Sequence, residues 1–298
     1  MTSFMDRDKL ALLMQAFDDL HEETCTLLNR HGSLPAEGSP AAKELATYSD
    51  QELVLTAYAQ ADFLTEAASE HVASFRRTAV EPALAMAPWA CVRAVIESSA
   101  LASWLLDPSV ECGERVKRSF AFRYEGVEQQ AKLARAVGDH AALENSQKRM
   151  DFLEERALAL GFTRVLDRKG NRIGVGLSMP PITALAGQVL DEEDTYRLLS
   201  AVAHAHIWAL HQVGYLNLGK SLDDRPGMVS MKKAAKPLCF KYLARKAVDA
   251  YSRPIVYKAT LFGWAGRDVE ERMQFYRREV RRLAEQLDAD NNEDGYTG

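Results

Sequence analysis

The sequence predicts an all-α protein, a helical bundle with one short β-hairpin insertion. Apolar residues recur three and four positions apart through most of the chain, which is the spacing of an amphipathic helix. Runs in which β-branched and polar residues alternate, as they do in half-buried strands, are few. Glycine, proline and serine interrupt the periodic stretches and divide them into segments of helical length.

The first half of the chain is expected to form five helices. Ser49 or Asp50 is suited to cap the second of them, and Pro108 prevents continuation of the third. The Gly-, Pro- and Ser-rich stretch GSLPAEGSPAAKE predicts a loop between the first two, and Gly138 ends the fourth. The expected helices cover about 7–31, 49–77, 82–106, 109–137 and 139–160.

The second half begins with the expected hairpin, RVLDRKGNRIGVG, which turns at residues 169–171. The next elements expected are a short helix after Pro181 and one long helix over 191–218. A helix over 228–262, kinked near Pro237 and Pro254, and a last helix over 267–287 follow. We predict a single domain over 1–288, with a core bundle at about 50–218, C-terminal helices at 228–287 and a disordered tail at 289–298.

The bulk composition is that of an ordinary globular protein, with 47% apolar and 27% charged residues among 298. A formal net charge of −5 argues against nucleic-acid binding driven by overall charge, although it allows a local basic face. The cysteines are scattered without CxxC spacing, which predicts reduced, buried thiols rather than disulfides or a zinc site. They are Cys25, Cys91, Cys112 and Cys239.

The most hydrophobic stretch, 83–106, is long enough to cross a bilayer, but Arg93 and Glu97 lie at its centre, where charges are costly in lipid. A buried helix of a bundle is therefore expected instead. The N-terminal sequence lacks the basic and apolar regions of a signal peptide. We expect a cytoplasmic protein without membrane contact.

The candidate catalytic residues are Arg197 and His204 on the expected 191–218 helix, with Ser200 between them and His211 extending the same stripe. Residues seven positions apart project from the same helix face. An imidazole can transfer a proton near neutral pH, and a guanidinium can hold a phosphate or stabilise its developing charge. These groups suit metal-independent RNA cleavage. In the alternative, the stripe is a polar packing face, and Arg197 pairs with Glu193.

The spacing of Arg197 and His204 resembles the Arg-x4–6-His pattern of the HEPN superfamily. The stretches RAVIESSALASWLLDP and YRLLSAVAHAHIWAL also look like helices of uncharacterised bacterial proteins related to that group. The resemblance implies an all-α fold, a ribonuclease or RNA-binding protein of a defence or toxin type, and a homodimer. The polar residue usual after the Arg is here Leu198. That departure favours an alternative, a catalytically inactive helical interaction or ligand-binding module.

Arg93 and Glu97 form a second candidate constellation. Four residues apart on an apolar helix, they are close enough to pair. Glu97 is suited to orient Arg197 or His204 across the bundle, with Arg93 in support. Alternatively, the pair is structural and fixes helix register. The Glu-x-x-His repeat of bundle metal sites is not present twice, so we expect neither a metal nor another cofactor.

A basic stretch interleaved with aromatic residues follows in the C-terminal part of the chain. Because the whole chain is acidic, this stretch predicts a local positive patch suited to RNA phosphates. Alternatively, it is a solvated helix face that pairs with acidic surface such as Asp223–Asp224 or the tail. The residues expected to contact RNA are Lys232, Lys233, Lys236, Lys241 and Arg245.

Overall fold

The computed structural model describes residues 7–32, 34–80, 83–220, 229–264 and 266–287. Within these ranges the all-α prediction is confirmed: long helices dominate and the strands are short. The helices are α1 Arg7–His31, α2 Pro40–Thr47, α3 Gln51–Ala79, α4 Ala87–Leu105, α5 Cys112–Val137, α6 His140–Ala159, α7 Ile182–Leu190, α8 Glu193–Ala203, α9 Ile207–Gly214, α10 Pro237–Phe262 and α11 Gly266–Gln286. The strands are β1 Arg164–Leu166, β2 Arg172–Val175, β3 Leu177–Ser178, β4 Tyr215–Lys220 and β5 Val229–Lys233.

Many helix ends coincide with a capping side chain, a glycine or a proline that favours a helix start or stop. Asp139 caps α6 by accepting a hydrogen bond from the amide of Ala142. Gly138 ends α5 and Gly263 ends α10, each in the left-handed conformation that glycine adopts without a steric cost. Pro237 begins α10 because a helix's first turn does not need the missing amide. The expected kink site at residue 237 is therefore a helix start.

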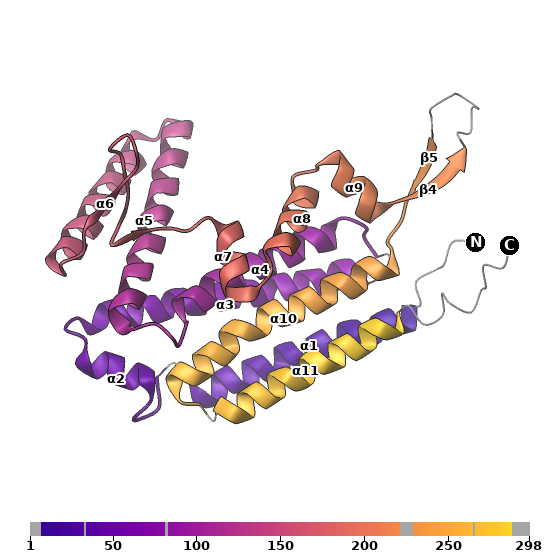
Figure 1. The fold of residues 1–298 in the computed structure, drawn as a ribbon, viewed down its shortest axis with the longest axis horizontal. Coiled ribbons are helices and arrows are strands. Elements are labelled where there is room, and N and C mark those ends of the chain that lie inside the picture. Colours follow the sequence, from indigo (N-terminus) through magenta and orange to yellow (C-terminus); the bar gives the residue numbers. More distant parts are fainter. Residues whose placement is uncertain (1–6, 33, 81–82, 221–228, 265, 288–298) are drawn as a thin grey trace.

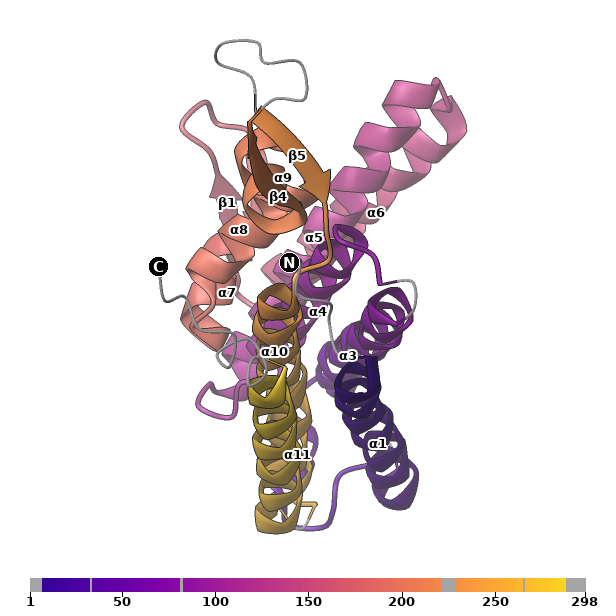
Figure 2. The same ribbon diagram turned by 90° about the vertical axis from the view of Figure 1, so that its right-hand side faces the viewer.

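The long helices α1, α3, α4, α10 and α11 form the main body of the fold. In Figure 1 they run side by side, and Figure 2 shows α10 and α11 stacked in one column beside α1 and α3. Their facing sides supply a continuous apolar core that includes Phe17, Phe75, Ile96 and Phe262. The buried helix α4 packs between α3 and α10 and also carries α7 and α8 on its surface. Helix α4 therefore connects the main body with α8, the helix that carries Arg197.

A smaller assembly projects from this body. Helices α5 and α6 form an antiparallel pair, and the predicted hairpin lies against α5 (Figure 1). That hairpin is extended by β3, so the sheet has three antiparallel strands in the order β1-β2-β3. Glu154 of α6 fixes the sheet by accepting hydrogen bonds from Arg164 and from Arg172, the latter at 2.7 Å.

The single long helix expected over 191–218 is wrong. The chain forms α8, turns at residues 204–206, forms α9 and continues as strand β4. Ala205 takes a positive φ of 56°, and the amides of Ala205 and His206 bond back to the carbonyls of Val202 and Ala201. These two bonds are those of a Schellman motif, which ends a helix. His211 consequently lies on another helix, away from the stripe that it was expected to extend.

Strands β4 and β5 form a second hairpin, which replaces the expected start of a helix at 228. It projects from the body together with α9 (Figure 1). Helix α2 was also missed, because its sequence was interpreted as a loop. Ser39 caps it by accepting a hydrogen bond from the amide of Ala42, and Pro40 occupies its first position.

Among the residues that the structure describes, none of the helices has both the length and the hydropathy that crossing a bilayer requires. The cysteines are free thiols, but they are half-buried and not buried as expected: Cys25, Cys91, Cys112 and Cys239. The expected disordered tail at 289–298 and the acidic pair Asp223–Asp224 lie outside the described residues.

Candidate functional site on helices α4 and α8

Helices α4 and α8 bring four polar side chains together from places about 100 residues apart in the sequence. Arg93 of α4 donates from Nε to Oγ of Ser200 at 3.1 Å and from Nη2 to the hydroxyl of Tyr196 at 2.9 Å. Tyr196 in turn donates to Oε2 of Glu97 at 2.9 Å. Arg93 and Glu97 form the predicted ion pair, with Nη2 and Oε2 3.1 Å apart.

We call Arg93, Glu97, Tyr196 and Ser200 the α4–α8 cluster. Its charged members are half-buried, while Tyr196 is buried. Burial, and then the Glu97 carboxylate, raise the pKa of Tyr196, so its phenol stays protonated at neutral pH. The guanidinium of Arg93 also lies over the Tyr196 ring, 5.2 Å from its centroid. The cluster therefore holds one arginine rigidly at the edge of the body.

Arg197 lies outside this network. Its side chain is 64% exposed, and it donates to Oε1 of Glu193 from Nη2 at 2.7 Å and from Nε at 3.2 Å. This is the pairing that the packing alternative expected. Glu97 therefore contacts Arg93 and Tyr196 in the described hydrogen-bond network, while the exposed Arg197 pairs with its own helix neighbour.

His204 ends α8 and is exposed. Its φ of −88° and ψ of 13° lie outside the helical region, although its amide still bonds to the carbonyl of Ser200. Arg197 and Ser200 share one side of α8, and His204 follows them at the capping position. Only Ser200 of these three belongs to the α4–α8 cluster.

The expected basic patch is divided between two elements. Lys232 and Lys233 lie on strand β5, where both are exposed, instead of on a helix. Lys236 donates from Nζ to the carbonyl of Gln212 at 2.7 Å. On α10, Lys241 and Arg245 both pair with Glu285 of α11. This helix face therefore pairs with acidic surface, as the alternative interpretation expected. Its acidic partner is Glu285 of α11, whereas the expected partner was Asp223–Asp224 or the tail.

Tyr196 is the member of the cluster that sequence reasoning missed. It lies four residues before Ser200, which lies four before His204, so the signal was a Tyr-x3-Ser-x3-His stripe at helical spacing. An aromatic residue on an apolar helix is usually part of the core, and Tyr196 does pack there with its ring. Its hydroxyl nevertheless bridges Arg93 and Glu97.

In the described ranges, no three His, Cys, Asp or Glu side chains converge as ligands of one metal ion would. Comparison of the chain with protein-family models, with curated proteins and with solved structures finds no match in any of the three.

Proposed function

We propose that the α4–α8 cluster, with Arg197 and His204 beside it, is a site for metal-independent RNA binding and cleavage of the HEPN-like kind. The observation that supports this proposal most is the fixed position of Arg93, which three side chains hold at the edge of the body. Fixed guanidinium donors suit a phosphate, whose charge rises as cleavage proceeds.

Arg197 can join such a site at low cost. Its partner Glu193 is also well exposed, and an exposed ion pair one helical turn apart contributes only about 0.3–0.5 kcal/mol. A phosphate can therefore replace Glu193 without a large loss of stability. The positive charge of Arg197 is held near the site and remains available.

His204 is suited to move the proton. Its neutral ring would accept the proton of a ribose 2′-hydroxyl as the 2′-oxygen attacks phosphorus. The bond from phosphorus to the 5′-oxygen then breaks, a 2′,3′-cyclic phosphate remains, and the leaving oxygen takes a proton from an acid. In a homodimer whose sites face each other, the second copy of His204 would supply that acid.

A homodimer is supported by the residues that follow His204. Ile207 and Trp208 begin α9 and are 70% and 58% exposed. Two large apolar side chains exposed side by side suit burial against a second copy, because aromatic residues contribute strongly to interfaces. Such a contact would bring the two copies of His204 close to each other.

Incubation of the purified protein with a mixed RNA pool in EDTA tests the activity. We expect cleavage that Arg197→Ala and His204→Ala each reduce by about 100-fold or more, the usual size of a general acid–base contribution. Matched controls are Arg282→Ala, an exposed arginine paired on its own helix, and His140→Ala, an exposed histidine of α6. Both controls should retain full activity.

Cleavage that survives both Arg197→Ala and His204→Ala would contradict the site assignment. Complete inactivity of the wild-type protein, with RNA affinity unchanged by Arg93→Met, would contradict the RNA function. That result would favour the catalytically inactive interaction or ligand-binding module, which a cavity between α1, α3 and α10 also supports.

A further inference from the structure

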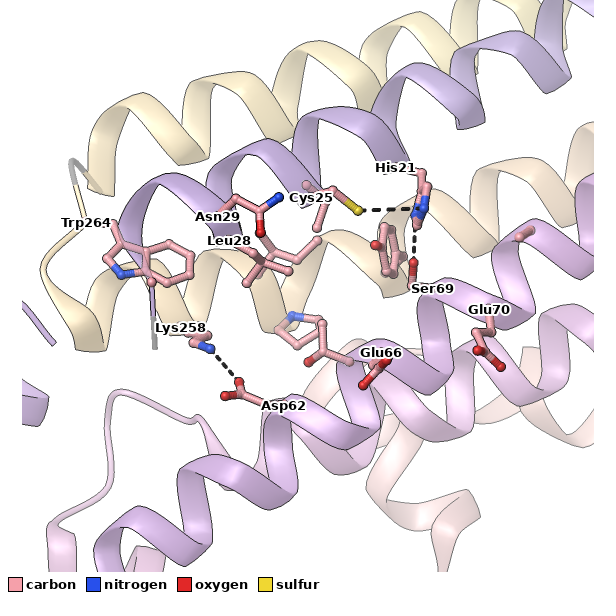
Figure 3. A pocket seen from close by; sticks show the side chains of 17 residues that line it. His21, Cys25, Leu28, Asn29, Asp62, Glu66, Ser69, Glu70, Lys258 and Trp264 are labelled. Atoms are coloured by element: carbon pink, nitrogen blue, oxygen red, sulfur yellow. Dashed lines mark hydrogen bonds and ion pairs between the residues drawn. The ribbon is translucent and has the colours of Figure 1, made fainter. Parts of the chain in front are cut away.

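A cavity of about 720 Å³ lies between α1, α3 and α10. Figure 3 shows its lining, with α1 along one wall, α3 along the opposite wall and Trp264 at one end. The volume falls in the range of small-molecule sites, about 300–1,000 Å³. Apolar residues form much of the surface: Leu28, Ala73, Tyr251, Pro254, Ile255 and Trp264.

Polar groups converge at the end opposite Trp264. His21 of α1 contacts Oγ of Ser69 on α3 through Nδ1 at 2.7 Å, and its Nε2 lies 3.7 Å from Sγ of Cys25 (Figure 3). Burial raises the pKa of Tyr251, which also lines the cavity, so its phenol stays protonated. The hydrogen-bonded pair of His21 and Ser69 therefore lines this end, with the half-buried Cys25 thiol beside it.

The charges of the lining are unbalanced. Lys258 is only 5% exposed, and Nζ binds Oδ1 of Asp62 at 2.5 Å, so these two charges compensate each other. Glu66 and Glu70 follow Asp62 along α3 on the exposed side of the lining (Figure 3). Neither carboxylate has an ion-pair partner among the described residues. The mouth of the cavity therefore carries two uncompensated negative charges.

Trp264 closes one end of the cavity. Its indole is buried against His31 and Lys258, and Nε1 has no hydrogen-bond acceptor among the described residues. That nitrogen is itself enclosed by protein, so the ring contributes apolar surface to the cavity. An apolar body and a positive charge at the mouth are thus the properties that this lining would recognise.

We propose that the cavity between α1, α3 and α10 binds an amphipathic organic cation, an amine with an aromatic body. The aromatic body lies against Leu28, Pro254 and Ile255, while the ammonium remains at the mouth beside Glu66 and Glu70. This binding site is separate from the α4–α8 cluster and does not depend on RNA cleavage.

Three ligands of nearly equal shape test the charge preference: 4-phenoxybutylammonium, 4-phenoxybutanol and 4-phenoxybutyrate. Binding to the full-length protein is followed by calorimetry and by protection of Cys25 from iodoacetamide, mapped by peptide mass spectrometry. Cys91, Cys112 and Cys239, also half-buried but outside the cavity lining, are internal controls. We expect the cation to bind most tightly, the anion least, and protection to be confined to Cys25.

The double variant Glu66→Gln/Glu70→Gln should weaken binding of the cation about three- to tenfold, as expected for two exposed ion pairs, and leave the alcohol unchanged. The matched control, Glu125→Gln/Glu155→Gln on α5 and α6, should change neither. Ala73→Phe should fill the cavity and abolish binding of all three ligands. Equal affinity for cation and anion, or no binding of any of the three, would overturn the proposal even if Ala73→Phe fails to fold.

Discussion

Arg115 shows how one side chain can organise a junction between distant segments. It is fully buried, and its guanidinium donates from Nε and Nη2 to the two carboxylate oxygens of Glu44, at 3.1 and 3.2 Å. It also donates to the backbone carbonyls of Leu105 and of Asp107, the latter at 3.1 Å. The ring of Tyr58 lies beneath it. One residue of α5 thus fixes both α2 and the turn that follows α4.

Arg115→Met should lower the free energy of unfolding by about 3–5 kcal/mol, because it leaves the Glu44 carboxylate and two carbonyls without their buried partner. Urea denaturation measures the change. Lys148→Met is the control, since its pair with Glu144 is 72% and 68% exposed, and it should cost less than about 1 kcal/mol. Similar losses for the two variants would contradict this role for Arg115.

Side-chain interactions were predictable from the sequence only where the partners are close along the chain. Arg93 and Glu97 are four residues apart, and the ion pair expected from that spacing is present. Glu44 and Arg115 are 71 residues apart, and no local pattern connects them. The contact of Ser200 with Arg93 depends in the same way on how α8 packs against α4, which periodicity alone does not determine.

At the scale of elements, the break between α8 and α9 is the most informative difference from prediction. A Schellman motif usually has glycine at the left-handed position, and here Ala205 occupies it. The stretch AVAHAHIWAL therefore contains no stop signal and favours a continuous helix. Where glycine or an aspartate cap was present, as at Gly138 and Asp139, the predicted ends were close to those of the structure.

Ala205→Gly should raise the free energy of unfolding by about 0.5–1 kcal/mol, because glycine relieves the strain of a positive φ. Ala59→Gly, an exposed position in the middle of α3, should instead lower it by about 1 kcal/mol. Both are measured by urea denaturation. A loss at Ala205 as large as that at Ala59 would mean that residues 191–218 form one helix in solution.

At the scale of the whole molecule, the layers of long helices could be predicted as a bundle but not in their packing order. Amphipathic periodicity identifies which face of each helix is buried, yet many pairings bury the same faces. Two smaller assemblies project from the body, α5–α6 with its sheet and α9 with the β4–β5 hairpin (Figure 1). Their positions depend on helix contacts that periodicity does not determine. The cavity likewise lies between helices, so the sequence of no single segment indicates it.

The exposed start of α9 should control the oligomeric state. We expect a dimer in sedimentation velocity, and Trp208→Glu should weaken it at least about tenfold, because a charge would be buried without a partner. The control is Phe152→Glu, a similarly exposed aromatic residue of α6. A monomeric wild-type protein, or equal effects of both variants, would contradict an interface at α9.

The walls of the cavity come from both ends of the chain. The ion pair between Asp62 and Lys258 joins residues 196 positions apart, and α1 completes the opposite wall. During synthesis on the ribosome, the cavity therefore cannot form until α10 has been made and has packed against α1 and α3. A nascent chain cannot retain a small molecule there, and a fragment lacking either terminal region would be unable to do so.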